Sequence, residues 1–173
     1  MVCFFRSRFL PSPSKNIATV LAITITLGSL LGAYCGYNFG NRTQVLLPIA
    51  IRERGSFISL ILVMSLPLFA SLLAIYVRLN WLTVPIVLIK AFAVSYLGSC
   101  IQRFYNDSGW LISFLFLYSD FLTLPILCWF WLCSGNDTSV KLQRCFGIAF
   151  ISLFGIALFD YRFVSSYLIY LLS

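Results

Sequence analysis

The stretch SFISLILVMSLPLFASLLAIYV at residues 56–77 decides the fold, because it is apolar along its length and carries no charged side chain. A helix needs about 20 such residues to cross the hydrocarbon of a bilayer. The rest of the chain has the same character: 61% of the 173 residues are hydrophobic, 10% are charged, and the mean hydropathy is +0.96. We therefore predict an all-α fold, a polytopic transmembrane helical bundle within the lipid bilayer.

Outward from this stretch, other apolar runs predict further helices of spanning length. The expected spans are 16–39, 56–77, 81–101, 110–133 and 145–159, with an apolar tail at 163–172. Pro67, Pro85 and Pro125 fall inside three spans and predict kinks, since proline removes an intrahelical hydrogen bond. Asp160 and Arg162 interrupt the fifth span, so we expect a helix ending near Asp160 and a short segment that re-enters the membrane or lies along its surface.

The chain is expected to form one transmembrane domain, residues 16–173, behind a basic head at residues 1–15. A basic segment before the first span usually stays in the cytoplasm. This favours a multi-pass protein of the cell membrane with its N-terminus inside and its C-terminus outside. The segment 41–55 predicts either a short amphipathic helix on the membrane surface or a plain loop.

Composition also argues against several functions. The net charge of +7 comes from basic residues scattered between apolar runs, without the basic stripe that binds nucleic acid. There is no histidine, and the six cysteines form no CxxC pair, so we expect neither a metal site nor another cofactor. The HExxH, GxSxG and Walker A motifs are absent, and Asp120 and Asp160 match no aspartyl protease signature. The sequence therefore predicts a protein that is not an enzyme.

Small residues recur at helical spacing in two spans. The first span has a glycine at every fourth position: Gly28, Gly32, Gly36 and Gly40. The third span has a weaker strip of small residues: Ala91, Ser95, Gly98 and Ser99. Such strips let another backbone approach closely and predict helix-packing faces. The partner of the glycine face is either another span, which is the simpler expectation, or a different protein, and a homo-oligomer is compatible with it.

Three ionisable residues, Lys90, Asp120 and Asp160, lie inside or at the edge of apolar spans. Each costs about 3 kcal/mol at the middle of a bilayer on insertion scales, so each should face the bundle interior or an aqueous cavity. Consecutive antiparallel helices would bring Lys90 and Asp120 to similar depth, which predicts an ion pair. Such a pair is either a polar site or proton relay, or a latch that fixes helix register, and the latch is the simpler reading.

The third and fourth spans resemble a known family. PIVLIKAFAVSYLG at residues 85–98 and WLISFLFLYSDFLTLP at residues 110–125 are similar to the stage II sporulation protein M family of bacterial membrane proteins. The matching positions are Lys90, Ala91, Phe92, Ser119, Asp120 and Pro125. Residues 157–167 resemble the close of the family's last span, with Asp160 where glutamate is usual, and residues 27–32 fit its glycine-rich opening. The chain departs from the family pattern at Ala91, where glycine is usual, and at Ser119-Asp120, where a Gln-Asn pair is usual.

The resemblance implies a noncatalytic membrane protein that holds or localises peptidoglycan hydrolases at the septal membrane. It implies two extracytoplasmic partners, an amidase and a lytic transglycosylase, acting in engulfment or cell-wall remodelling. The alternative is a membrane-embedded subunit of a small-molecule transporter of the vitamin-binding type, which kinked spans and buried charge would suit. An inert assembly factor is a third reading.

Overall fold

The computed structural model describes residues 15–40, 56–77, 79–105, 109–134, 139–164 and 166–167. The helices are α2 (Lys15–Phe39), α4 (Phe57–Tyr76), α5 (Thr83–Tyr105), α6 (Gly109–Phe116), α7 (Tyr118–Ser134) and α8 (Ser139–Phe159). A 3-10 turn, η2 (Asn80–Leu82), precedes α5, and a π-helical turn, η4 (Asp160–Val164), extends α8. The described part contains helices and no strands. The segment 41–55 and most of the head and tail lie outside it.

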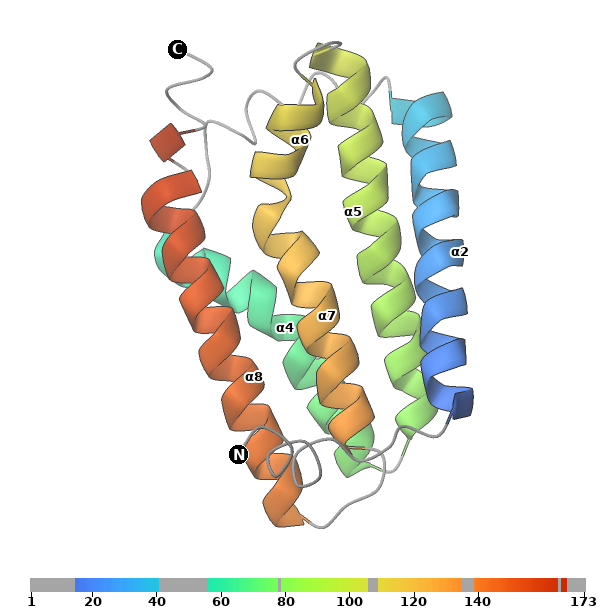
Figure 1. Ribbon diagram of the computed structural model, residues 1–173, viewed down its shortest axis with the longest axis vertical. Coiled ribbons are helices and arrows are strands. Elements are labelled where there is room, and N and C mark those ends of the chain that lie inside the picture. The colour runs from blue at the N-terminus through green and yellow to red at the C-terminus, as the bar shows by residue number, and fades with distance from the viewer. Residues whose placement is uncertain are drawn as a thin grey trace, which may run out of the picture.

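The helices stand side by side, and successive spans along the chain run in opposite directions (Figure 1). Four of them are long and apolar enough to cross a membrane: α2, α4, α5, and α8 with its extension η4. Taken together, α6 and α7 are also long and apolar enough to cross a membrane, although the two helices are bent by 52° relative to each other. Because this pair leads from one end of the bundle to the other, it serves as one broken span, and the predicted helical bundle is confirmed.

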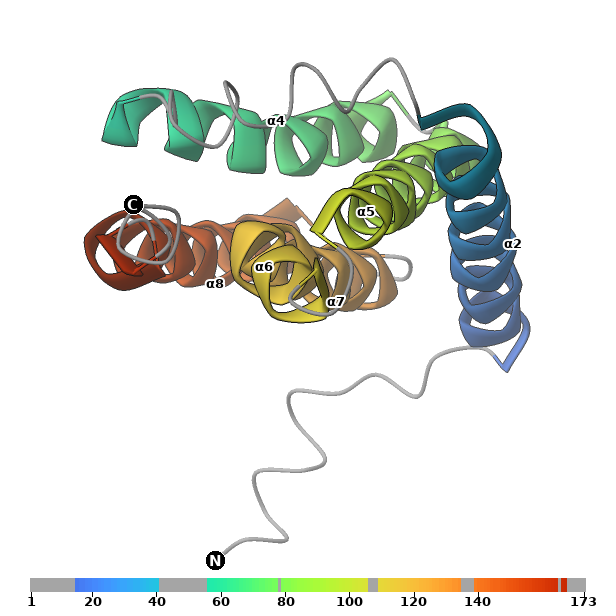
Figure 2. The same cartoon turned by 90° about the horizontal axis from the view of Figure 1, so that it is seen from above.

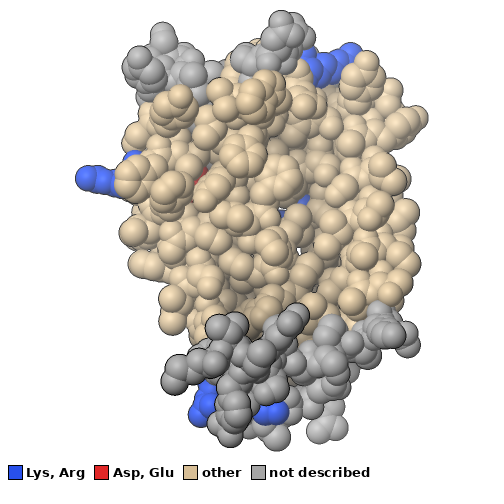
Figure 3. Space-filling view, in the orientation of Figure 1, with Lys and Arg blue, Asp and Glu red and all other residues tan. Residues whose placement is uncertain are grey.

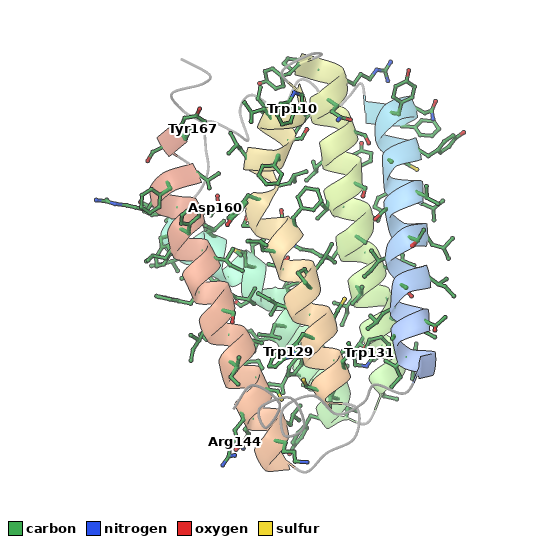
Figure 4. The ribbon with its side chains drawn as sticks, viewed as in Figure 1. Trp110, Trp129, Trp131, Arg144, Asp160 and Tyr167 are labelled. Carbon is green, nitrogen blue, oxygen red and sulfur yellow. The ribbon has the colours of Figure 1, made fainter. Side chains whose placement is uncertain are left out.

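The surface of the bundle suits an apolar solvent. Large hydrophobic side chains such as Leu30, Leu66 and Ile151 are exposed along its length, and charged side chains are sparse over the middle of the face in Figure 3. In Figure 4, Trp110 lies near one end of the bundle, while Trp129 and Trp131 lie toward the other. Tryptophan gathers at the two interfaces of a membrane, so the exposed Trp110 indicates one end of the spans, whereas Trp131 is buried.

In the described part of the chain, many of the buried residues form three hydrophobic clusters. The largest joins α4, α7 and α8 through residues such as Met64, Phe130 and Leu153. Leu21, Val87 and Trp131 join α2, α5 and α7 near one end, and Ile101, Ile112 and Val164 join α5, α6 and η4 near the other. Seen from above, α2 stands at the edge of the bundle, beside α5 (Figure 2). Its packing therefore depends mainly on α5, with a minor contact to α7.

Two expectations about the spans need correction. The sharp bend of the fourth span is at Leu117, two turns before Pro125, and the backbone bonds from Leu117 N–H to Ser113 O and from Phe121 N–H to Leu117 O persist across it. Pro85 lies in the first turn of α5, where its missing N–H removes no helical bond. Pro125 therefore does not produce the bend of the fourth span, and Pro85 does not interrupt the hydrogen bonding of α5.

The fifth span is longer than expected. It begins at Ser139, and it does not stop at Asp160, because η4 continues the helical path to Val164. The two charged residues are accommodated in opposite ways: Asp160 is completely buried, whereas Arg162 is exposed. An outward arginine can extend toward the membrane surface, so it need not end a span.

Candidate functional site

The glycine face of α2 packs against α5. A Cβ atom placed on Gly28 would lie 2.8 Å from the carbonyl oxygen of Leu88, and one on Gly36 would lie 2.5 Å from that of Tyr96. At Gly32 the added atom would collide with the carbonyl group of Phe92. Hydrogen is therefore the only side chain that fits. The partner of this face is another span of the same chain, the simpler of the two alternatives.

The same contacts fix the relative direction of the two helices. Residues 28, 32 and 36 of α2 meet residues 88, 92 and 96 of α5 in the same order, so the helices run parallel. At their common end, Arg103 donates to the carbonyl oxygen of Tyr37, and its guanidinium carbon lies 5.6 Å from the centre of the Tyr37 ring. A cation is favourable there because the last carbonyls of α2 carry partial negative charge. Arg103 thus holds the end of the glycine seam.

Lys90 and Asp120 form the predicted ion pair. Lys90 Nζ donates to Asp120 Oδ1, which links α5 to α7. The Lys90 side chain is 13% exposed and that of Asp120 is 28% exposed, so the pair is largely removed from solvent. Asp120 belongs to the first turn of α7, just after the bend at Leu117. The helix dipole favours a carboxylate at that position.

Asp160 does not join this pair. It is completely buried at the start of η4, and in Figure 4 it lies at the far end of α8 from Arg144. Two other residues of the family motif, Phe92 and Pro125, lie apart from the ion pair's contact. Phe92 stacks on Tyr96 with ring centres 5.9 Å apart, and Pro125 is exposed on α7. In the described part of the chain, no group of three or more cysteine or carboxylate side chains is placed to hold a metal ion.

A cleft of about 520 Å³ lies on the other side of α5. Its floor is α5, and its walls are Ala33 of α2 and a row of side chains from α6 and α7. The lining residues are Ala33, Val94, Ser95, Gly98, Ser99, Gln102, Trp110, Ser113, Phe114, Leu117 and Phe121. In Figure 3 the apolar face is hollowed near its middle, and a small basic area is visible in the hollow. Lys90 and Asp120 are one helical turn from Val94 and Leu117, respectively, so the ion pair adjoins the inner end of the cleft.

The small-residue strip of α5 therefore has two roles. Ala91 and Ser99 approach the glycines of α2, as a packing strip should, with Ser99 Cβ 2.9 Å from the Cβ position of Gly36. Ser95, Gly98 and Ser99 also line the cleft, which the sequence reading did not predict. Gln102, Ser113 and Trp110 were also not predicted. Their only sequence signal is that they place polar or amphipathic groups beside apolar runs, a signal too common to single them out.

Comparison with known proteins adds no identification. No protein-family model matches the chain, and neither a curated protein nor a solved structure matches it. The resemblance to the stage II sporulation protein M family therefore rests on the motif residues alone.

Proposed function

We propose that this chain is a noncatalytic membrane scaffold that holds peptidoglycan hydrolases, an amidase and a lytic transglycosylase, at the cell membrane. The observation that carries the proposal is the contact between Lys90 and Asp120, the two charged positions of the motif in the third and fourth spans. A carboxylate paired with an ammonium group is a poor nucleophile or general base. The pair is better suited to fixing the register of α5 and α7, which is what a rigid scaffold requires.

The scaffold would present its loops at the outer end of the bundle to extracytoplasmic partners. This end follows from the basic head, which favours a cytoplasmic N-terminus and an outer C-terminus. The helical spans themselves would face lipid, in agreement with their exposed apolar side chains. Recruitment would thus depend on the assembled bundle and its loops.

The test is copurification of partners from a sporulating host that encodes the chain. The tagged full-length protein is extracted in detergent, and bound proteins are identified by mass spectrometry. We expect a peptidoglycan amidase or lytic transglycosylase with the wild type and with Lys141→Met, and less of it with Lys90→Met, which leaves Asp120 without its cation. Purification of the wild type without any such hydrolase would contradict the proposal.

The second candidate is the membrane subunit of a small-molecule transporter, and the cleft beside α5 is the observation that favours it. A transporter site would need the charged pair as well, but the lining of this cleft includes neither Lys90 nor Asp120. Saturable binding of a water-soluble vitamin, abolished by Lys90→Met, would establish this function over the scaffold.

A further inference from the structure

The cleft beside α5 exposes polar side chains where the bundle faces lipid. Ser113 Oγ donates to the carbonyl oxygen of Gly98, at 3.2 Å. The side chains of Ser95, Ser99 and Gln102 form no hydrogen bond with any other described residue. In hydrocarbon, a polar group without a partner is unfavourable by several kcal/mol. A molecule in the cleft that accepts hydrogen bonds would remove this cost.

The cleft begins near the membrane surface and reaches inward. Trp110 marks the outer part, because it lies near the end of the bundle (Figure 4). From Gln102 to Val94, the floor runs along two turns of α5, a depth of about 12 Å at the rise of an α-helix. The polar side chains of Gln102 and Ser99 lie toward the outer end, whereas Phe121 and Val94 lie deeper.

This order of groups matches an amphipathic lipid. In a glycerophospholipid, ester carbonyls lie below the phosphate, and acyl chains lie below the esters. Amide and hydroxyl donors suit the carbonyls, and the aromatic wall of Phe114 and Phe121 suits a chain. Arg103 does not line the cleft, but it follows Gln102 in the last turn of α5. Its guanidinium group has further donors besides the one that binds the Tyr37 carbonyl oxygen. Guanidinium groups bind phosphate well.

We propose that this cleft binds one glycerophospholipid of the surrounding bilayer. Its phosphate meets Arg103, its ester carbonyls accept hydrogen bonds from Gln102 and Ser99, and one acyl chain lies along Phe114 and Phe121. The lipid enters sideways, since the cleft is bordered by residues of α2, α5 and α6 and the face of the bundle is hollowed near its middle (Figure 3). This role does not depend on the scaffold function proposed above.

Native mass spectrometry of the full chain in detergent, titrated with phosphatidylglycerol, tests the proposal. We expect one lipid per chain at low concentration. Gln102→Leu and Arg103→Gln should each weaken that first binding step about tenfold, as the loss of a hydrogen bond to a polar or charged group predicts. The matched controls are Gln143→Leu and Arg162→Gln, which change the same residue types at exposed positions of α8 and η4. They should leave the affinity unchanged.

Three outcomes would overturn the proposal. The first is lipid binding without a defined stoichiometry and equal in all variants. The second is a dimer that forms in the wild type and is lost in Gln102→Leu, which would make a second copy the occupant. The third is a small polar adduct retained from the cell in place of lipid. Arg103 also binds the carbonyl oxygen of Tyr37, so Arg103→Gln could fail to fold. In that case Arg103→Lys, which keeps a cation and a hydrogen-bond donor, serves as the second variant.

Discussion

The two sides of α5 present similar small residues, but one side packs closely against α2 and the other borders a cleft. Toward α2, the small residues meet glycines, and the two backbones touch. Beside α6, Ser95, Gly98 and Ser99 border a cleft of about 520 Å³. The difference lies in the facing helices, because α2 presents hydrogens whereas α6 and α7 present Trp110, Phe114 and Phe121. A small residue in a span thus permits close packing, and the opposite residue decides whether it occurs.

The comparison also separates two ways of holding helices together in lipid. The seam between α2 and α5 depends on shape, since apolar side chains gain little from leaving hydrocarbon. The contact between α5 and α7 includes an ion pair at the first turn of α7, and this contact depends on charge. Variants that change only shape or only charge should therefore affect the two sides of α5 differently.

The largest effect is expected for Gly32→Leu. Any Cβ at this position collides with the carbonyl group of Phe92, so α2 must leave its only major neighbour or α5 must shift. The free energy of unfolding should fall by at least about 3 kcal/mol, more than ordinary overpacking causes, because the obstacle is backbone. Unfolding in detergent, followed by circular dichroism during SDS titration, measures the loss.

Gly155→Leu is the matched control for this prediction. Gly155 is also a helical glycine, but a Cβ atom there would meet nothing within 4 Å. Its replacement should leave stability the same or raise it slightly, since leucine is the better helix former. Equal losses at both positions would mean that the seam is no more constrained than the lipid-facing surface.

The ion pair should give the next largest effect, in a double-mutant cycle of Lys90→Met and Asp120→Asn. Each single variant leaves one polar or charged group without its partner, and we expect a loss of about 2 kcal/mol, below the range for fully buried pairs because both side chains retain some exposure. The double variant should lose less than the sum, with a coupling of about 1 kcal/mol. SDS titration of the four proteins gives all the values. Additive losses would show that the two charges act independently.

Much of this arrangement could be predicted from the order of residue types along the sequence. Uncharged apolar runs such as 56–77 predict the spans, since a helix needs only sufficient length and apolarity to cross a bilayer. The glycine spacing gives the packing face of α2. The Lys90–Asp120 pair follows because consecutive spans run in opposite directions and bring residues of equal depth together.

Other features depend on three-dimensional neighbours and have no comparable sequence signal. The 52° bend lies at Leu117, where the sequence has neither proline nor glycine. The cleft requires Ala33, Ser99 and Phe114 from three separate helices to border one space. The order of the helices around the bundle makes α5 the neighbour of α2, and the hydropathy of the sequence does not predict that order. The glycine face alone did not identify its partner for this reason.

The smallest effect is expected for Ser113→Ala, which bears on the polar side of α5. This change removes the hydrogen bond to the Gly98 carbonyl, the one polar link between α6 and the floor of the cleft that the described residues contain. Hydrogen bonds between membrane helices contribute about 0.6 kcal/mol on average, so we expect a loss of that order. Ser152→Ala is the control, because the Ser152 hydroxyl bonds only to Ile148 O of its own helix. A loss at Ser113 no larger than at Ser152 would mean that the aromatic wall, rather than this bond, holds α6 beside the cleft.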